Sequence, residues 1–385
     1  PRSNGNPGTL QMRFERVLLP TGFPASVRAG LGISLLSLLP LPATTVTAQE
    51  GFTLEEVLSA PFPEGLVSAP DAGTVAWVYN HRGVRNIWAR VAGDDLPRRV
   101  TDYQEDDGQV ITDLVVTPDG ASILFTRGGA PNSRGEIPNP LSKVEGADRS
   151  LFSVPTGEGE PRELGQGGGA ALSPDGSKLA FSRPGNTIWI LALEEGAEAQ
   201  QVAAIRGSPG SFRWAPVGRS LALVSGRGDH SFVGVLDLLE ESLTYLDPSL
   251  NRDQSPTWSP DGERIAFIRA PYPRGILPFT PVREALPWSI RVVEVGTGAA
   301  HTAWEAPEGP GSAFHGVSAA NQLLWAAEDR IVFPWEGNGW LNLYSVSASG
   351  GEAVALAPGA FEVQFVALSA EGRDVLFSSN QGDID

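Results

Sequence analysis

A strand–turn–strand unit built on Pro-Asp-Gly recurs along this chain and constrains its fold more than any other feature. It is clearest at residues 171–181, which read ALSPDGSKLAF. In such a unit Pro sets φ for the turn, Asp bonds the nearby backbone and Gly takes the positive-φ position. Further copies, some of which depart from the Pro-Asp-Gly motif, begin at Val67, Val116, Trp214, Trp258 and Leu368. Six hairpins of one kind indicate an internal repeat.

Each repeat contains room for four strands. The turn prolines Pro70, Pro118, Pro174, Pro216 and Pro260 are 42 to 56 residues apart. One strand precedes the turn, a second follows it, a third carries an aromatic–apolar signature such as Thr187-Ile-Trp189, and a fourth follows a second turn. A period of about 40–50 residues with four strands per unit is typical of a propeller blade. The sequence therefore predicts an all-β fold, a β-propeller of four-stranded antiparallel blades.

The blades can be numbered along the chain. Six complete ones are expected at 66–102, 111–165, 169–204, 211–248, 255–305 and 313–358. A seventh begins at Glu362 and stops after its second strand, at Ser379. An open sheet edge invites aggregation, so we expect the natural protein to continue beyond Asp385 and to hold seven or eight blades. The propeller domain is thus assigned to 66–385, after a lead-in linker at 49–65 with a short helix at 52–59.

The N-terminal residues 1–48 have the order of a secretory signal. Arginines follow Met12, an apolar run spans 31–41, and small residues lead to Ala48. This pattern predicts a start at Met12, with upstream residues before it, and cleavage after Ala48. The apolar run is short and ends in prolines, which argues against a stable membrane span. We therefore expect a periplasmic or secreted protein.

Composition excludes several classes of function. A net charge of −17 argues against nucleic-acid binding, and the absence of cysteine excludes disulfides, thiol catalysis and thiolate metal sites. The four histidines have no paired spacing that would suggest a metal site. We expect neither a cofactor nor a metal, and the sequence leaves the oligomeric state open, a homo-oligomer included.

The blade pattern also sorts the loops onto two faces. Turns between the first and second strands are short and share one face, whereas connections between the second and third strands lie on the other, termed the long-loop face. That face carries insertions at 128–149 and 270–288. Long loops on a rigid scaffold tend to carry function. The candidate substrate-binding residues on it are Arg82, Arg85, Asp229 and His230.

Five stretches of the chain resemble a known family. They are AWVYNHRGVRNIWARV from Ala76, RGDHSFVGVLDL from Arg227, WSPDGERIAFIR from Trp258, GWLNLYSV from Gly339 and FSSNQGDID from Phe377. Together they resemble the propeller of the prolyl oligopeptidase family, in particular secreted bacterial dipeptidyl-peptidase IV-like and acylaminoacyl-peptidase-like serine peptidases. The resemblance implies a propeller that caps a C-terminal α/β-hydrolase domain, gates peptide substrates and leaves the Ser–Asp–His triad to that domain. The alternative is a stand-alone TolB-like periplasmic propeller that binds proteins.

No catalytic residue is predicted within this chain. The nearest approach to a nucleophile elbow is Gly316-Val-Ser318-Ala-Ala320, which lacks the last glycine and a following helix. The run Gly165–Ala170 approaches a dinucleotide fingerprint, but a strand follows where that motif needs a helix. Dipeptidyl-peptidase IV relatives clamp the substrate amine with two glutamates. Here the pairs at 194–195 and 240–241 fall on the short-turn face and the pair at 55–56 precedes the propeller, so a dipeptide-releasing specificity is not supported.

Overall fold

The structure is a computed structural model that divides into two units, 1–52 and 53–385. It describes residues 53–55, 59, 61–69, 72–132, 134–272, 286–309, 311–369 and 371–382. The predicted signal peptide lies outside the described residues. Leu54 and Glu55 are helical, and the Ser59 amide donates to the Glu55 carbonyl at 2.9 Å, which agrees with a short lead-in helix.

Strands of the first three blades follow one another in chain order. Blade one contains β1 (Phe62–Ala69), β2 (Thr74–His81), β3 (Val84–Arg90) and β4 (Arg98–Arg99). Blade two contains β5 (Ile111–Val116), β6 (Ser122–Arg127), β7 (Ser150–Pro155) and β8 (Arg162–Gln166). Blade three contains β9 (Gly168–Leu172), β10 (Lys178–Arg183), β11 (Thr187–Ala192) and β12 (Gln200–Ala204).

The remaining strands continue the same meander. Blade four contains β13 (Ser208–Trp214), β14 (Ser220–Gly226), β15 (Ser231–Asp237) and β16 (Ser242–Tyr245). Blade five contains β17 (Arg252–Trp258), β18 (Arg264–Ala270), β19 (Ser289–Glu294) and β20 (Ala300–Glu305). Blade six contains β21 (Leu324–Ala326), β22 (Arg330–Trp335), β23 (Asn342–Ser347) and β24 (Val354–Ala355). A two-stranded sheet, β25 (Val363–Leu368) with β26 (Val375–Ser379), follows.

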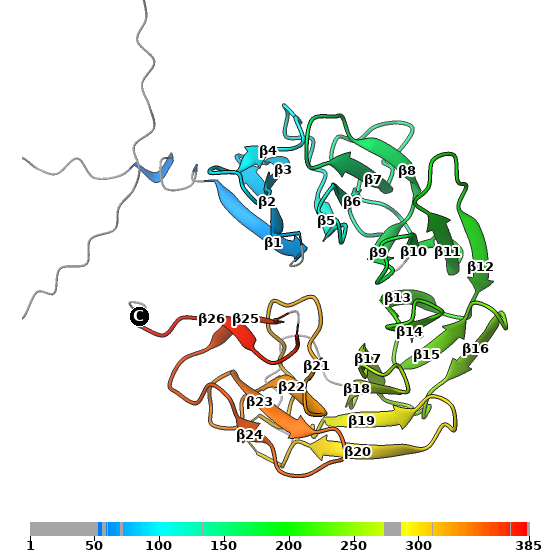
Figure 1. Ribbon diagram of the computed structural model, residues 1–385, viewed down its shortest axis with the longest axis vertical. Coiled ribbons are helices and arrows are strands. Elements are labelled where there is room, and N and C mark those ends of the chain that lie inside the picture. Colours follow the sequence, from blue (N-terminus) through cyan, green and yellow to red (C-terminus); the bar gives the residue numbers. More distant parts are fainter. Residues whose placement is uncertain are drawn as a thin grey trace, which may run out of the picture. The chain divides into compact units, whose positions relative to one another are not determined.

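The sheets succeed one another around a common centre, with the first strand of each innermost (Figure 1). Within each sheet consecutive strands pair antiparallel, and a single parallel bridge between Ser231 and Arg252 joins blades four and five. The hydrophobic core is divided among six clusters, and each cluster draws its residues from two neighbouring blades. Each blade is thus stabilised by packing against its neighbours rather than by a core of its own. The predicted all-β propeller is confirmed.

The Pro-Asp-Gly turns form by the chemistry expected from their sequence. In the turn at 117–122 the Gly120 amide donates to the Thr117 carbonyl at 2.8 Å, and Gly120 has φ of 71°. The Asp119 carboxylate accepts from the Ala121 amide at 3.0 Å and from the Thr117 hydroxyl at 2.6 Å. The Thr117 hydroxyl in turn accepts from the Ser122 amide at 3.0 Å. The residue before the proline is therefore part of the turn.

This hydrogen bonding predicts an unusually acidic carboxyl group at Asp175. The hydroxyl of Ser173 at 2.6 Å, then the amide and hydroxyl of Ser177, lower the pKa of Asp175 from 3.8 to about 2. A carboxyl with a lowered pKa in the folded state contributes stability above its unfolded pKa and loses it as the pH falls through the folded value. We expect Ser173→Ala to raise the pKa of Asp175 towards 3.8, measured by NMR titration of the carboxyl carbon. A pKa that stays near 2 in that variant would assign the shift to another cause.

A bulge recurs in the inner strands and was not visible in the sequence. In five blades the residue five positions before the turn proline has a positive φ, and the pairing register shifts there. These residues are Gly65, Asp113, Gly169, Ser211 and Ser255. A bulge increases the local twist of a strand, which suits an inner strand that must turn from one blade towards the next.

Two predicted blade starts differ from the structure by four residues or more. The first strand begins at Phe62 rather than Leu66, inside the expected linker. The sixth blade begins at Leu324 rather than at 313, because the preceding residues form an irregular connection. The Gln322 side chain bridges that connection by accepting from the Val317 amide and donating to the Val317 carbonyl, both at 2.9 Å. None of the helices among the described residues has the length and hydrophobicity needed to cross a bilayer.

Candidate functional site

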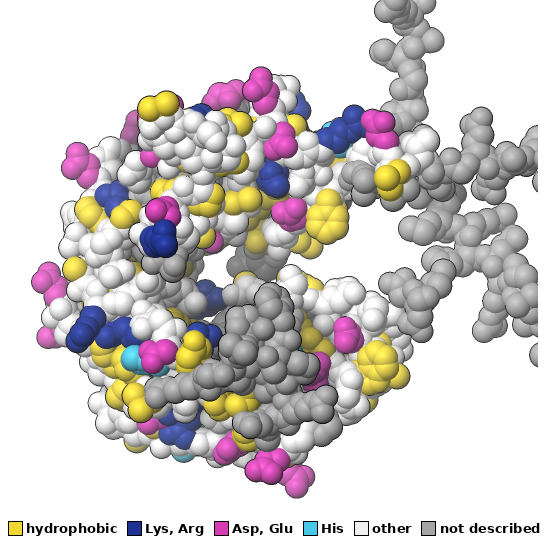
Figure 2. All heavy atoms as spheres, turned by 180° about the vertical axis from the view of Figure 1, so that it is seen from behind, with side chains coloured by type: hydrophobic (Ala, Val, Ile, Leu, Met, Phe, Trp, Pro, Cys, Tyr) yellow, Lys and Arg dark blue, Asp and Glu magenta, His cyan; other side chains and the backbone are white. Residues whose placement is uncertain are grey.

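The long-loop face is built as the sequence predicted. The second strands of blades one to six all end on this face, where the third strands begin, and the links from one blade to the next lie there too. Figure 2 shows the molecule from this side, with acidic side chains spread along the rim and several Lys and Arg side chains nearer the middle. In a chain of net charge −17, this grouping of cations is a feature of the face.

Arg82 and Arg85 lie at the hairpin between β2 and β3. The predicted loop is a two-residue turn, with Arg82 at φ 53° and Gly83 at φ 87°. The exposed guanidinium of Arg82 lies 3.4 Å from the Glu55 carboxylate. Arg85 is half-buried and donates to the Gly83 carbonyl at 3.0 Å. Both arginines are therefore in reach of solvent on the long-loop face.

Asp229 and His230 lie in the connection between β14 and β15. The imidazole Nδ1 of His230 is 2.7 Å from the Asp229 carboxylate, and its ring packs edge-on against Phe232 at 5.0 Å between centroids. Arg227 lies over Phe232 and donates to the Tyr245 hydroxyl at 3.0 Å. The pair thus belongs to a small stack of aromatic and cationic side chains.

The structure does not join the two pairs of predicted residues in one cavity. Arg82 and Arg85 belong to blade one, Asp229 and His230 to blade four, and none of the cavities described below is lined by any of them. Their role in substrate binding stays a prediction.

Ser318 lies in the irregular connection before β21 rather than in a strand or a strand-to-helix turn. Its amide donates to the Gln364 carbonyl of β25 at 2.9 Å. The neighbouring His315 imidazole pairs with the Glu336 carboxylate at 2.6 Å. No hydrogen bond in the described part of the chain joins that imidazole to the Ser318 hydroxyl, and no helix follows.

The glycine run and the glutamate pairs fall where the sequence placed them. The run at 165–170 links β8 directly to β9, so strands flank it on both sides. Gly167 has φ of 144°, and a Cβ there would lie 2.6 Å from the Phe181 ring. The pairs at 194–195 and 240–241 lie in turns between the third and fourth strands, on the short-turn face. The two glutamate pairs therefore lie away from the long-loop face.

A chain of ion pairs stabilises the long-loop face between blades four and five. Arg269 donates to both oxygens of the Asp253 carboxylate at 2.8 and 3.0 Å and to the Asp247 carboxylate at 2.9 Å. Arg291 donates to the same Asp247 oxygen at 2.8 Å. Asp253 is fully buried, and burial raises the pKa of its carboxyl although Arg269 opposes the shift. Burial disfavours the charge on Arg269 as well, but its bonds to Asp253 and Asp247 raise its pKa.

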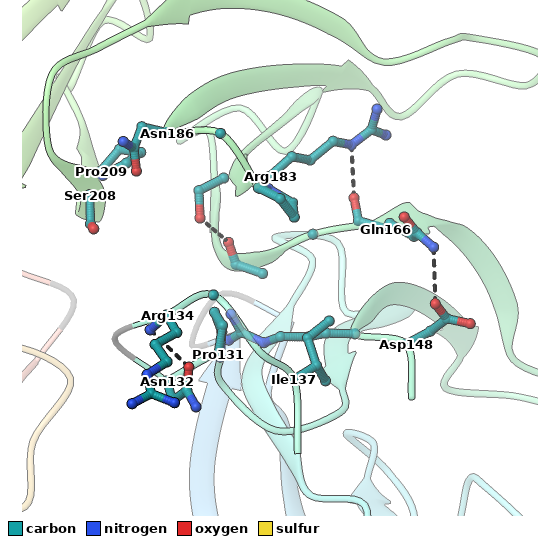
Figure 3. Close-up of a pocket in the computed structure, with 17 residues that line it drawn as sticks. Pro131, Asn132, Arg134, Ile137, Asp148, Gln166, Arg183, Asn186, Ser208 and Pro209 are labelled. Carbon is teal, nitrogen blue, oxygen red and sulfur yellow. Dashed lines mark hydrogen bonds between the residues drawn. The ribbon is translucent and has the colours of Figure 1, made fainter. Parts of the chain in front are cut away.

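A cavity of about 550 Å³ opens between blades two and three. One wall is the 128–149 insertion, and the other is the β8–β9 link with the end of β10. Figure 3 shows Arg134, Pro131 and Ile137 on one side and Arg183 and Gln166 on the other. Three arginines line it, namely Arg134, Arg149 and Arg183, against one carboxylate, Asp148.

Two further cavities lie by the inner strands of the first and seventh blades. The larger, of about 880 Å³, is lined by β1, β2 and β5, by β25 and by residues 318–320. The smaller, of about 370 Å³, includes Arg213 of β13. Burial lowers the pKa of Arg213, whose guanidinium donates to the carbonyls of Phe212 and Ala320. Across the described ranges, no three His, Asp or Glu side chains gather closely enough to hold a metal ion.

The fold and this loop-bearing face define the chain as a β-propeller, and solved structures of peptidases share that fold. Dipeptidyl peptidase 4 of Porphyromonas gingivalis superposes with a TM-score of 0.56 at 13% identity, over 85% of this chain and 52% of that one. A prolyl endopeptidase superposes with a TM-score of 0.56 at 12% identity, over 83% of this chain and 46% of that one. A puromycin hydrolase superposes with a TM-score of 0.51 at 16% identity, over 83% of this chain and 50% of that one. This chain thus spans about half the length of each. Neither the sequence models of protein families nor the curated protein sequences give a match.

Proposed function

We propose that this chain is the non-catalytic propeller of a secreted serine peptidase of the prolyl oligopeptidase family. It would restrict access and orient peptides for a C-terminal α/β-hydrolase domain that performs the acyl transfer. The observation that carries the proposal is the match to three peptidases, which takes in more than four fifths of this chain but only about half of each peptidase. These proportions fit a propeller that this chain shares with the peptidases and that each peptidase joins to a further domain.

The long-loop face supports this role. It gathers the insertion at 128–149, a cavity of about 550 Å³ and arginines able to bind peptide carbonyls or carboxylates. The blades beneath it are held rigidly by cores shared between neighbours. A rigid scaffold with variable loops is the usual arrangement for selective binding. Arg82, Arg85, Asp229 and His230 are further candidates for contact with substrate on the same face.

The gene downstream of the Asp385 codon tests this proposal. We expect a Gly-x-Ser-x-Gly motif, followed by Asp and His within about 250 residues, the size of one further domain. We expect the full-length protein to react with a fluorophosphonate at that serine and to cleave short peptides, while folded proteins resist. The variant with alanine at that serine is the control for both assays.

Two outcomes contradict the proposal. A stop codon soon after one more hairpin would leave a stand-alone propeller, and the TolB-like protein-binding role would then be preferred. Equal cleavage of folded proteins and short peptides by the full-length enzyme would remove the gating role.

A further inference from the structure

Arg149 is a cation whose charge the described residues only partly balance. Its guanidinium lies 3.5 Å from the Asp113 carboxylate, and its Nε is buried without a hydrogen-bond partner. That carboxylate already accepts from the Thr126 hydroxyl and the Gly169 amide, both at 2.8 Å. An anion that binds the guanidinium from the cavity side would balance the rest of this charge through charge-assisted hydrogen bonds.

The glycine run explains how Arg149 reaches the cavity between blades two and three. A Cβ on Gly168 would lie 2.2 Å from the guanidinium carbon of Arg149, so only glycine permits this close approach. The guanidinium thus lies flat against the backbone of the β8–β9 link, at the cavity that both line. This close approach is a packing reason for the glycine at position 168.

Arg183 faces the same cavity from the end of β10. Its Nε donates to the Gln166 carbonyl at 2.8 Å, and its guanidinium lies 4.0 Å from the centre of the Trp189 ring. These contacts fix the plane of the guanidinium and leave its two terminal nitrogens without a carboxylate among the described residues. Burial lowers the pKa of Arg183, as expected for a cation that loses water without gaining an anion.

The cavity's acidic residue is hydrogen-bonded to Gln166, another residue of the lining. Asp148 is exposed and accepts from the Gln166 side-chain amide at 3.0 Å (Figure 3). The exposed Arg134 adds a third cation at the rim. The remaining lining is suited to a peptide, because it combines apolar groups of Pro131 and Ile137 with amides that both donate and accept hydrogen bonds.

We propose that this cavity is a binding site for a peptide carboxylate, held by the planar guanidinium groups of Arg149 and Arg183 with Arg134 at the entrance. Planar forks of donors match a carboxylate in two-point hydrogen bonds. The carboxylate can be the C-terminus of a peptide or an acidic side chain. The site needs only this chain, so its presence does not depend on a downstream hydrolase.

Isothermal titration of the 385-residue chain with three N-acetylated peptides tests the site. They are tri-alanine with a free C-terminus, tri-alanine amide, and Ala-Glu-Ala amide, which carries its carboxylate on the side chain. We expect at least one carboxylate peptide to bind ten or more times as tightly as tri-alanine amide. Whichever of the two binds more tightly identifies the source of the carboxylate.

The variants R183Q, R134Q and R149K assign the binding to the cavity. We expect R183Q and R149K each to weaken carboxylate binding about tenfold, the loss expected for a charge-assisted hydrogen bond. R134Q should weaken it less. R149K keeps the charge but removes the planar fork, so its loss separates geometry from charge. The matched control is R162Q, which removes an exposed arginine from β8 outside this cavity and should leave the dissociation constant within twofold. Thermal unfolding of each variant checks its folding, and R183Q and R134Q alter side chains that stay in reach of solvent.

Several results would overturn this site. Equal binding of tri-alanine amide and the carboxylate peptides would do so, as would unchanged binding in R183Q and in R149K. Inorganic phosphate that binds as tightly as the peptides would show a general anion site instead. None of these results bears on the downstream motif, and the absence of that motif would leave peptide binding by this chain unaffected.

Discussion

Asp253→Ala is expected to lower the free energy of unfolding by about 3 to 5 kcal/mol, the loss typical when one partner of a buried ion pair is removed. Asp253 is fully buried and accepts two hydrogen bonds from Arg269. Without it the Arg269 guanidinium, whose side chain is only 13% exposed, retains Asp247, which Arg291 already shares. Denaturant unfolding followed by circular dichroism measures the change.

A double variant separates the lost attraction between Asp253 and Arg269 from the cost of leaving the Arg269 charge buried without its partner. In Asp253→Ala with Arg269→Met no cation is left unpaired, and Asp247 keeps Arg291 as its partner. We expect this variant to regain about half of the lost stability or more, because apolar replacement of a buried pair is often neutral. Asp95→Ala, at an exposed position between β3 and β4, is the control and should change stability by less than about 0.5 kcal/mol. A loss below about 1 kcal/mol in Asp253→Ala would contradict the importance of the pair.

The parts of the fold that the sequence predicted are those that local chemistry determines. The Pro-Asp-Gly turns form with Gly120 and its counterparts at positive φ and with the aspartates bonded to the following amides. The strand before the turn then alternates in burial, as in β5, and the strand after it has a continuous buried run, as in β6. Blade order and loop face follow from the antiparallel meander. Each of these conclusions needed only residues a few positions apart.

The bulges and the sixth blade's start could not be predicted, because non-local contacts determine them. Asp113, Ser211 and Ser255 adopt positive φ although non-glycine residues rarely do so. At Asp113 the reason is visible, since its carboxylate accepts from Thr126 and from the Gly169 amide of the next blade. A partner so far along the chain leaves no local pattern in the sequence.

The arginine cavity was missed for a related reason. Sequence reasoning placed the 128–149 insertion on the long-loop face but gave no role to Arg134 or Arg149 within it. Their neighbour Arg183 comes from the next blade, so only the packing of two blades brings the three together. The glycine run at 165–170 was the usable signal, because glycine within a strand often marks a close approach by another group.

The junctions between blades also depend on hydrogen bonds that the repeat itself encodes. Trp214, at the end of β13, donates its indole N–H to the Ala171 carbonyl of β9 at 2.9 Å. Trp258, one blade later, donates to the Arg213 carbonyl of β13 at the same distance. Each tryptophan precedes its turn and thus connects its own inner strand to the preceding one. The sixth blade departs from this rule, since the Trp325 indole donates to Asp329 within its own blade.

Trp258→Ala is therefore expected to lower the free energy of unfolding by about 3 to 5 kcal/mol, the cost of removing a large buried aromatic side chain. Trp258 is 9% exposed and packs in the cluster shared by blades four and five. Trp258→Phe keeps most of the packing but leaves the Arg213 carbonyl without its donor, for a loss of about 1 to 3 kcal/mol. Trp340→Ala, at a side chain 40% exposed, should cost clearly less. Denaturant melts that place Trp258→Ala and Trp340→Ala at the same midpoint would show that the indole does not hold the two blades together.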